Sequence, residues 1–184
     1  MEKKRIDVKK YVLVAVLAAL ISIISPLSIN VLTIPFSLSI FIIALVALTF
    51  PPIYTVLAVL IYIALGVLGV PVFAGFKSGL GVLGGVTGGY IIGYIPFAIL
   101  VSYANYIFKN KMVIEILMIV AGLFCCYLTG LIWYVIQTDN TFSSAFLTTV
   151  APFILPDVIK IVIAFVISMQ LKRVPFIKEM FDKE

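Results

Sequence analysis

Six long apolar segments, joined by short connections, limit this chain to one broad class of structure. They cover residues 11–29, 34–50, 53–70, 83–107, 112–136 and 155–171. About 20 consecutive apolar residues cross a bilayer as a helix, so all six qualify, the second and third only just. No soluble domain could bury a chain that is 64% hydrophobic, 11% charged and has a mean hydropathy of +1.27. The sequence therefore predicts an all-α integral membrane protein, a single six-helix bundle over residues 1–184.

Lysines and arginines flank these segments almost entirely on one side. Eleven of them lie before the first segment, between the fourth and fifth, or after the sixth: Lys3, Lys4, Arg5, Lys9, Lys10, Lys109, Lys111, Lys172, Arg173, Lys178 and Lys183. Basic residues are enriched in cytoplasmic connections, so both termini are predicted to be cytoplasmic. The first segment resembles a signal peptide but lacks a convincing cleavage site, and we expect it to be retained. This topology places the connection with Lys77 and the start of the last segment together on the outer face.

Asp157 and Lys160 are the only acid and base that stand together inside an apolar segment. Residues three apart on a helix share a face, so both side chains project the same way. Each unpaired charge in hydrocarbon costs about 2.5–3.5 kcal/mol by insertion scales, and such residues are usually functional. In a ligand site, Asp157 would accept N–H bonds and Lys160 would donate to a carbonyl or carboxylate. A structural ion pair, or a lysine reaching toward the membrane interface, is the alternative.

Two glycine clusters, at residues 75–81 and 84–89, flank the start of the fourth segment. Glycine permits close backbone approach and irregular geometry, so the clusters predict either close helix packing or a loop over an outward-facing ligand pocket. A phosphate-binding loop is excluded because the G-x-x-x-x-G-K-[ST] order is absent. A group of aromatic residues would form either a membrane-interface belt or a pocket wall: Tyr90, Tyr127, Trp133 and Tyr134.

Several classes of site have no support in the sequence. There is no histidine, and the adjacent Cys125 and Cys126 point in different directions on a helix, which suits neither a disulfide nor a metal site. No metal, cofactor or catalytic residue is therefore expected. The basic residues indicate membrane topology and not nucleic-acid binding. Ala15 and Ala19 form a small-xxx-small pair, against which a helix of this chain or of a partner would pack closely.

These motifs together resemble the BioY family, the biotin-specific S components of energy-coupling factor (ECF) vitamin transporters. The resemblance covers essentially the whole chain and rests on residues 69–75 (GVPVFAG), residues 84–90 (GGVTGGY), Trp133 and residues 156–160 (PDVIK). It implies a multi-pass protein of a prokaryotic cell membrane that captures biotin from outside. Such a subunit would dock on a transmembrane coupling subunit bearing two ATPase subunits, which alone would use ATP.

The resemblance also implies roles for individual residues. Asp157 and Lys160 would hold the ureido head of biotin, and Lys77 would meet the carboxylate of its valerate tail. Ala15 and Ala19 match the family's A-x-x-x-A pattern, which packs on the coupling subunit. The ligand-binding residues expected on this basis are Asp157, Lys160, Lys77, Tyr90, Trp133, Gly88 and Gly89.

Two positions depart from the family pattern. Val86 stands where the glycine-rich motif usually has proline, and Ser39 stands where relatives often have glutamine. Other functions stay open: an S component for another small vitamin, one working without the ATPase module, or a membrane-embedded enzyme that uses Asp157 or Lys160 as acid or base. The absence of histidine and of an obvious nucleophile disfavours the enzyme.

Overall fold

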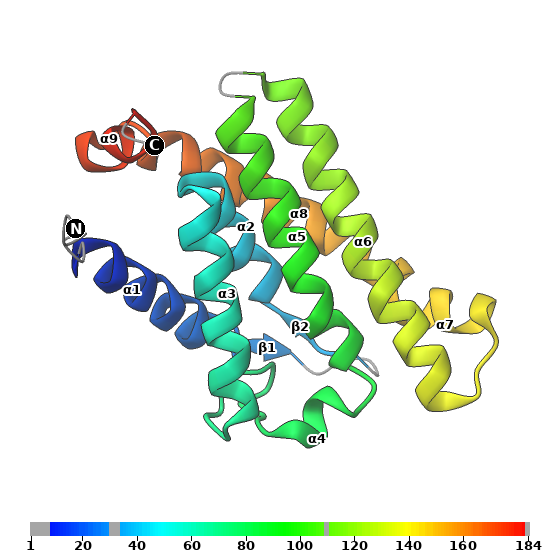
Figure 1. Ribbon diagram of the computed structural model, residues 1–184. Coiled ribbons are helices and arrows are strands. Elements are labelled where there is room, and N and C mark those ends of the chain that lie inside the picture. The colour runs from blue at the N-terminus through cyan, green and yellow to red at the C-terminus, as the bar shows by residue number, and fades with distance from the viewer. Residues whose placement is uncertain (1–7, 30–33, 109–110, 183–184) are drawn as a thin grey trace, which may run out of the picture.

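The fold is predominantly helical, as the computed structural model in Figure 1 shows for residues 8–29, 34–108 and 111–182. A small two-stranded sheet, β1 (Ser28–Ile29) and β2 (Phe36–Ser37), lies among the helices. The helices are α1 (Val8–Ile24), α2 (Ser39–Thr49), α3 (Pro52–Val67), α4 (Leu80–Leu83), α5 (Gly88–Ile107), α6 (Met112–Thr138), α7 (Phe142–Thr149), α8 (Ala151–Leu171) and α9 (Pro175–Asp182).

Three helical stretches in the described part of the chain are long and apolar enough to cross a membrane. They are Gly88–Ile107, Met112–Thr138 and Phe142–Leu171, and the last joins α7 and α8. The helices α2 and α3 are apolar but have only 11 and 16 residues, and α1 has 17. The chain is thus a multi-pass membrane protein, while the six-span count with its cytoplasmic termini stays a prediction.

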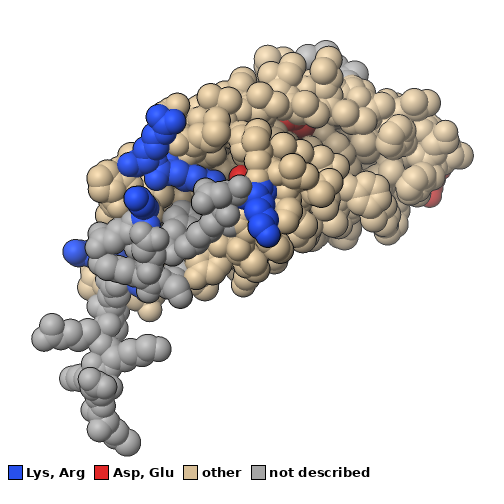
Figure 2. All heavy atoms as spheres, turned by 90° about the horizontal axis from the view of Figure 1, so that it is seen from above, with Lys and Arg blue, Asp and Glu red and all other residues tan. Residues whose placement is uncertain are grey.

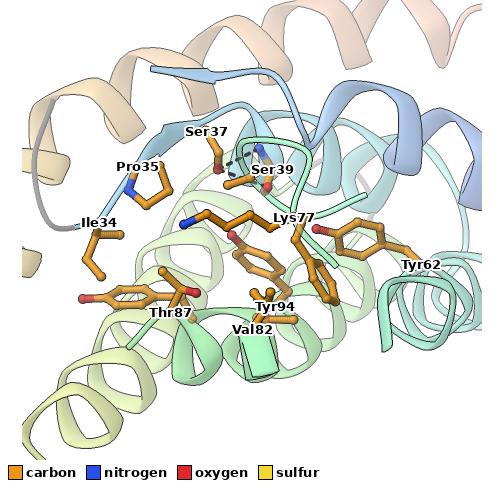
Figure 3. Close-up of a pocket in the computed structure, with 13 residues that line it drawn as sticks. Ile34, Pro35, Ser37, Ser39, Tyr62, Lys77, Val82, Thr87 and Tyr94 are labelled. Atoms are coloured by element: carbon orange, nitrogen blue, oxygen red, sulfur yellow. Dashed lines mark hydrogen bonds between the residues drawn. The ribbon is translucent and has the colours of Figure 1, made fainter. Parts of the chain in front are cut away.

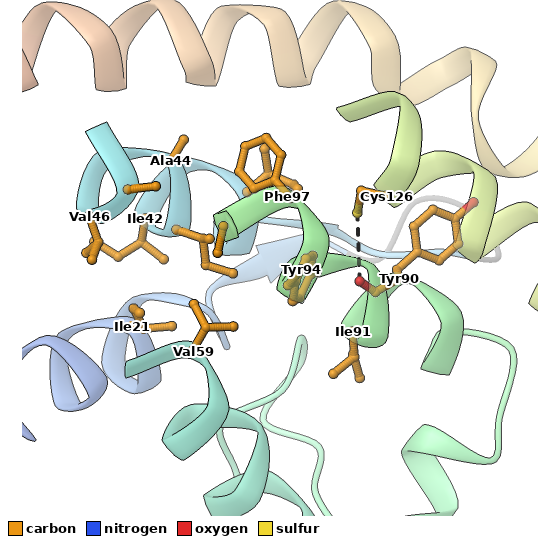
Figure 4. Close-up of a cluster of buried hydrophobic side chains, with 14 of the residues drawn as sticks. Ile21, Ile42, Ala44, Val46, Val59, Tyr90, Ile91, Tyr94, Phe97 and Cys126 are labelled. Atoms are coloured by element: carbon orange, nitrogen blue, oxygen red, sulfur yellow. Dashed lines mark hydrogen bonds between the residues drawn. The ribbon is translucent and has the colours of Figure 1, made fainter. Parts of the chain in front are cut away.

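The short helix α2 lies at the centre of the bundle. Its side chains are buried on all sides, including Ile42, Ile43 and Leu48, which are fully buried. A helix that is apolar all round is typical of such a position. It packs mainly on α8 and α5, and side chains from α1 and α3 meet it from another side, as Figure 4 shows around Ile42 and Val59. Burial within protein explains why so short an apolar segment forms a stable helix.

The helices α5 and α6 form the most extensive helix pair, and small residues make their approach possible. A β-carbon at Gly89 would overlap Trp133, and a β-carbon at Gly130 would overlap the ring of Tyr90. At Gly88 a β-carbon would collide with the backbone of the preceding turn. Gly89 in the second glycine cluster therefore serves the close packing of α5 on α6, one of the two alternatives drawn from the sequence.

The connection after α1 differs from the sequence prediction. The first predicted segment, 11–29, ends as a helix at Ile24, and the second, 34–50, becomes helical only at Ser39. Between them β1 and β2 pair in antiparallel register, with Ser28 opposite Ser37. Proline lacks a backbone N–H donor, and Pro26 therefore favours the end of α1 within this turn.

Two later boundaries differ as well. The fourth predicted segment, 83–107, is continuous helix only from Gly88, because the single turn α4 and a bend precede it. The connection between the fifth and sixth predicted segments contains α7, at whose start the Thr141 side chain accepts a hydrogen bond from the N–H of Ser144 at 3.4 Å. The last segment begins at Ala151, four residues before the predicted start of 155–171.

Basic side chains gather at one end of the molecule. Figure 2 views that end from above and shows Lys and Arg on one side of a surface that is otherwise mostly uncharged. The basic residues described near this end are Lys9, Lys10, Lys111, Lys172, Arg173 and Lys178. The loop with Lys77 lies near α4, toward the opposite end in Figure 1. This arrangement agrees with the charge asymmetry of the sequence, although residues 1–7, 109–110 and 183–184 lie outside the described part.

Candidate ligand-binding site

Asp157 and Lys160 lie one turn apart on α8 and contact each other inside the protein. The Lys160 Nζ donates to Asp157 Oδ1 at 2.9 Å, and the Asp157 residue is only 4% exposed. Each also has a second partner. Tyr127 of α6 donates its hydroxyl to Asp157 Oδ2 at 2.7 Å, and Lys160 Nζ donates to the backbone carbonyl of Ser37 in β2 at 2.7 Å. The ion pair expected as an alternative is present, but as part of a larger network.

Among the described residues, this network leaves hydrogen-bonding capacity on both charged groups. An ammonium group has three N–H donors, of which Lys160 uses two within that part of the chain, and a carboxylate offers about four acceptor positions, of which Asp157 uses two. The Asp157 and Lys160 charges cancel, so a net charge on a ligand has no counter-charge here. The pair therefore suits a neutral group that offers N–H donors beside a carbonyl, as in an amide or a urea.

Two adjoining cavities open beside this network. The second contains Tyr127, Asp157 and Lys160 in its wall, whereas the first contains Lys77 and Thr87. The residues common to both walls are Ile34, Pro35, Ser37, Tyr90 and Tyr94. Each cavity has a volume of about 40 Å³, far below the roughly 300–1,000 Å³ of small-molecule pockets. A vitamin-sized ligand would occupy them only after the shared wall moved.

Lys77 lies on the loop between α3 and α4 and is exposed, yet its side chain reaches the first cavity. Figure 3 shows it extending between Tyr94 and Pro35, with its amino group directed toward Ile34. A tight turn holds the loop, in which Phe73 and Lys77 exchange backbone hydrogen bonds at 3.0 and 3.3 Å. A cation therefore lies across the shared wall from the Asp157–Lys160 pair.

The remaining predicted ligand residues are distributed unevenly around the cavities. Tyr90 contributes to the walls of both, and its hydroxyl donates to the backbone carbonyl of Thr149 at 2.8 Å. Trp133 lines neither cavity, and its indole N–H donates to the Gly85 carbonyl at 2.9 Å. Gly88 and Gly89 also line neither and lie in the packed interface around α5.

Ala15 and Ala19 lie on a face of α1 that the described protein does not cover. Both alanines are exposed, whereas Val14, Leu17 and Ala18 on the opposite face are buried. Internal packing, one of the two explanations drawn from the sequence, therefore accounts for the buried face and not for the Ala15–Ala19 pair.

Sequence reasoning missed two contributors to the site. Ser37 acts through its backbone carbonyl, which carries no sequence signal. Tyr94 lines both cavities one turn after Tyr90, and the spacing of four residues in a helix is a signal that would have found it. Within the described residues, no group of three or more His, Cys, Asp or Glu side chains is placed to hold a metal ion.

Comparison with known proteins identifies the family and the fold of this chain. Residues 1–175 match the BioY family. The chain belongs to the BioY family. The resemblance drawn from the sequence motifs is thereby confirmed. The BioY-family relatives below are named as transporters, in line with the expectation of a protein that is not an enzyme.

Two relatives cover nearly the whole chain. The "probable biotin transporter BioY" of Pyrococcus horikoshii is 36% identical over 164 residues, 89% of this chain and 96% of the relative. The "biotin transporter BioY" of Thermotoga maritima is 35% identical over 169 residues, 86% of this chain and 92% of the relative. The crystal structure of an S-component for biotin from an ECF-type ABC transporter matches with a TM-score of 0.84 over 98% of this chain and 99% of that chain. At 23% identity, that match shows that the two proteins share a fold.

Proposed function

We propose that this protein is the substrate-binding S subunit of an ECF-type transporter for biotin uptake. It would capture biotin from the outer face and pass it to an ATP-driven coupling module. The observation that carries the proposal is the buried Asp157–Lys160 pair in the wall of a cavity. The two charges cancel, while Asp157 can still accept hydrogen bonds from N–H groups and Lys160 can still donate one to a carbonyl. The names of the BioY-family relatives support biotin as the ligand.

The chemistry of biotin matches the order of groups along the two cavities. The ureido head is neutral and carries two N–H donors and one carbonyl, which suit Asp157 and Lys160. The fused apolar ring would pack on the shared aromatic wall of Tyr90 and Tyr94. The valerate carboxylate would then extend toward Lys77 in the first cavity. Trp133 and Gly89 would support this site from the α5–α6 interface, and Gly88 from its contact with the preceding turn, instead of contacting the ligand.

The proposal includes an arrangement in the membrane. The chain would cross the bilayer six times, with both termini in the cytoplasm and the cavities facing outward. The basic end in Figure 2 would face the cytoplasm, as basic connections generally do. The exposed Ala15–Ala19 face of α1 would receive a helix of the coupling subunit, because small residues let helices approach closely.

Titration calorimetry of the detergent-purified protein with biotin tests the ligand. Saturable binding is expected, and Asp157→Asn should weaken it by roughly tenfold to a hundredfold, the usual value of a hydrogen bond to a charged group. Asp139→Asn is a matched control, because this exposed carboxylate at the end of α6 lies outside both cavities. Absence of saturable biotin binding by the unmodified protein would refute the proposal.

The coupling surface requires a separate measurement. Ala19→Trp should leave biotin affinity within about twofold, since distant sites act nearly independently, while it prevents co-purification with the coupling subunit and its ATPases. Leu20→Trp is the control, because that exposed position on α1 is already large. Equal co-purification of both variants would exclude the alanine face as the docking surface.

A further inference from the structure

Among the described residues, two side chains donate hydrogen bonds to the Asp157 carboxylate. Lys160 lies on α8 together with Asp157, whereas Tyr127 lies on α6. The Tyr127 hydroxyl donates to Oδ2 at 2.7 Å, while Lys160 occupies Oδ1. The helix α6 packs chiefly on α5, and α8 packs chiefly on α2. The hydroxyl therefore bridges two helices that are not each other's main neighbours, directly at the polar site.

The hydrogen bond from Tyr127 affects how the Asp157–Lys160 pair can bind a ligand. In a low-dielectric interior, Asp157 and Lys160 attract each other strongly, and a carboxylate free to rotate would turn both oxygens toward the ammonium. In such an arrangement the hydrogen bonds within the pair would compete with those to any ligand. Tyr127 holds Oδ2 on the side of α6, and the Ser37 carbonyl holds one Lys160 N–H on the side of β2. Each of the two charged groups is thus held by a different element, Asp157 by α6 and Lys160 by β2.

The hydroxyl of Tyr90 does not substitute for that of Tyr127. Tyr90 lies in the wall of the same cavity, but its hydroxyl donates to the Thr149 carbonyl. Cys126, beside Tyr127 in sequence, directs its thiol toward the Tyr90 carbonyl at 3.8 Å. Phe153 offers a ring that stacks on Phe36 with centroids 4.4 Å apart.

We propose that Tyr127 is a positioning residue, which holds the Asp157 carboxylate in the orientation that receives an N–H donor of the ligand. Its hydroxyl keeps Oδ2 from turning to Lys160, so that the third N–H of Lys160 stays free for the ligand carbonyl. The proposal rests on the proposed function only for the identity of the ligand, biotin. The selectivity of the site for a urea-type group then depends on a residue that need not touch it.

A double-mutant cycle measured by biotin titration tests this role. Tyr127→Phe removes the hydroxyl and keeps the ring, and it should weaken biotin binding by about tenfold or more. In the Asp157→Asn background, the same change should alter affinity by less than about twofold, because the group that Tyr127 positions is already altered. Tyr103→Phe is the control, since that tyrosine is 48% exposed on α5 and lines neither cavity. A purely structural role would give equal losses in both backgrounds and would overturn the proposal.

An infrared measurement without biotin provides an independent readout. The carboxylate stretching bands that disappear in Asp157→Asn should shift in Tyr127→Phe, because one donor to Oδ2 is lost, and should not shift in Tyr103→Phe. Unchanged Asp157 bands in Tyr127→Phe would refute the positioning role. If the unmodified protein fails to bind biotin while these bands shift as expected, the proposed function fails and the role of Tyr127 stands.

Discussion

Replacement of Gly89 by alanine should destabilise the protein by forcing α5 away from α6. The added methyl carbon would overlap the Trp133 side chain and would lie 2.5 Å from the backbone oxygen of Thr129. The Trp133 atom nearest to the added methyl is its β-carbon, whose position the backbone of α6 fixes, and the Thr129 carbonyl inside the same helix cannot rotate away either. The contact is relieved only if one helix shifts as a body.

The size of the effect follows from the cost of overpacking. An extra methylene in a well-packed core costs about 1–3 kcal/mol, and a clash with backbone belongs at the upper end, about 3 kcal/mol. For a chain of this length, 1 kcal/mol shifts the melting temperature by about 2–4 °C, so a decrease of roughly 6–12 °C is expected. Biotin affinity should fall as well, because Tyr90 adjoins Gly89 and lines both cavities.

Thermal unfolding of the detergent-purified variant, followed by the fluorescence of the single tryptophan, measures this change. Gly81→Ala is the matched control, because a β-carbon there meets nothing within 4 Å, and its melting temperature should stay within about 2 °C of the unmodified protein. A Gly89→Ala variant with an unchanged melting temperature and weakened biotin binding would refute the packing argument. It would return Gly89 to the role of a ligand contact.

Three further changes have distinct expected outcomes. Lys77→Gln should weaken biotin binding by about two- to fivefold, because an exposed ion pair contributes only about 0–1 kcal/mol. It should not affect the binding of biotin amide, and an equal loss for both ligands would contradict a contact between Lys77 and the carboxylate. Trp133→Phe removes the bond to Gly85 and should lower the melting temperature by about 2–4 °C, for about 1 kcal/mol; an unchanged value would show that this bond is dispensable. Lys172→Met leaves the buried Glu115 without its cation 3.9 Å away and should destabilise the protein by about 1–2 kcal/mol. Adding Glu115→Gln to this variant should restore most of the stability, as measured by thermal unfolding, and the absence of any recovery would exclude the ion pair as the cause.

Much of the fold was predictable because hydrophobic length is a strong local signal. The last three segments predicted from the sequence correspond to α5, α6 and α8, and the second and third were recognised as barely long enough. Connections were predicted less well. The pairing of β1 with β2 involves only two residues on each strand, and such short strands have no periodicity to read. The helix α7 was not predicted, because residues 142–149 are less apolar than the membrane segments around them.

The site was predictable only in part, for a similar reason. Asp157 and Lys160 stand out in the sequence because buried charge is costly in a membrane, and their spacing of three places them on one face. Tyr94 and Ser37 do not stand out, because a tyrosine near an interface and a backbone carbonyl are common features. Trp133, Gly88 and Gly89 were expected at the ligand through family motifs, but none of them lines either cavity. Trp133 and Gly89 meet in the α5–α6 interface, and Gly88 lies against the backbone of the preceding turn.

The sequence by itself determined the membrane class, the one-sided distribution of basic residues and the isolated pair of charges in the last segment. Each of the three follows from composition and local spacing, and none depends on where distant residues lie. Only the tertiary structure decided whether Asp157 and Lys160 bond solely to each other or also to other residues. Tyr127 is 30 residues from Asp157, and Ser37 is 123 residues from Lys160. Long-range packing alone brings these residues together. The contacts from Tyr127 and Ser37 keep Asp157 and Lys160 from directing all of their hydrogen-bonding groups at each other.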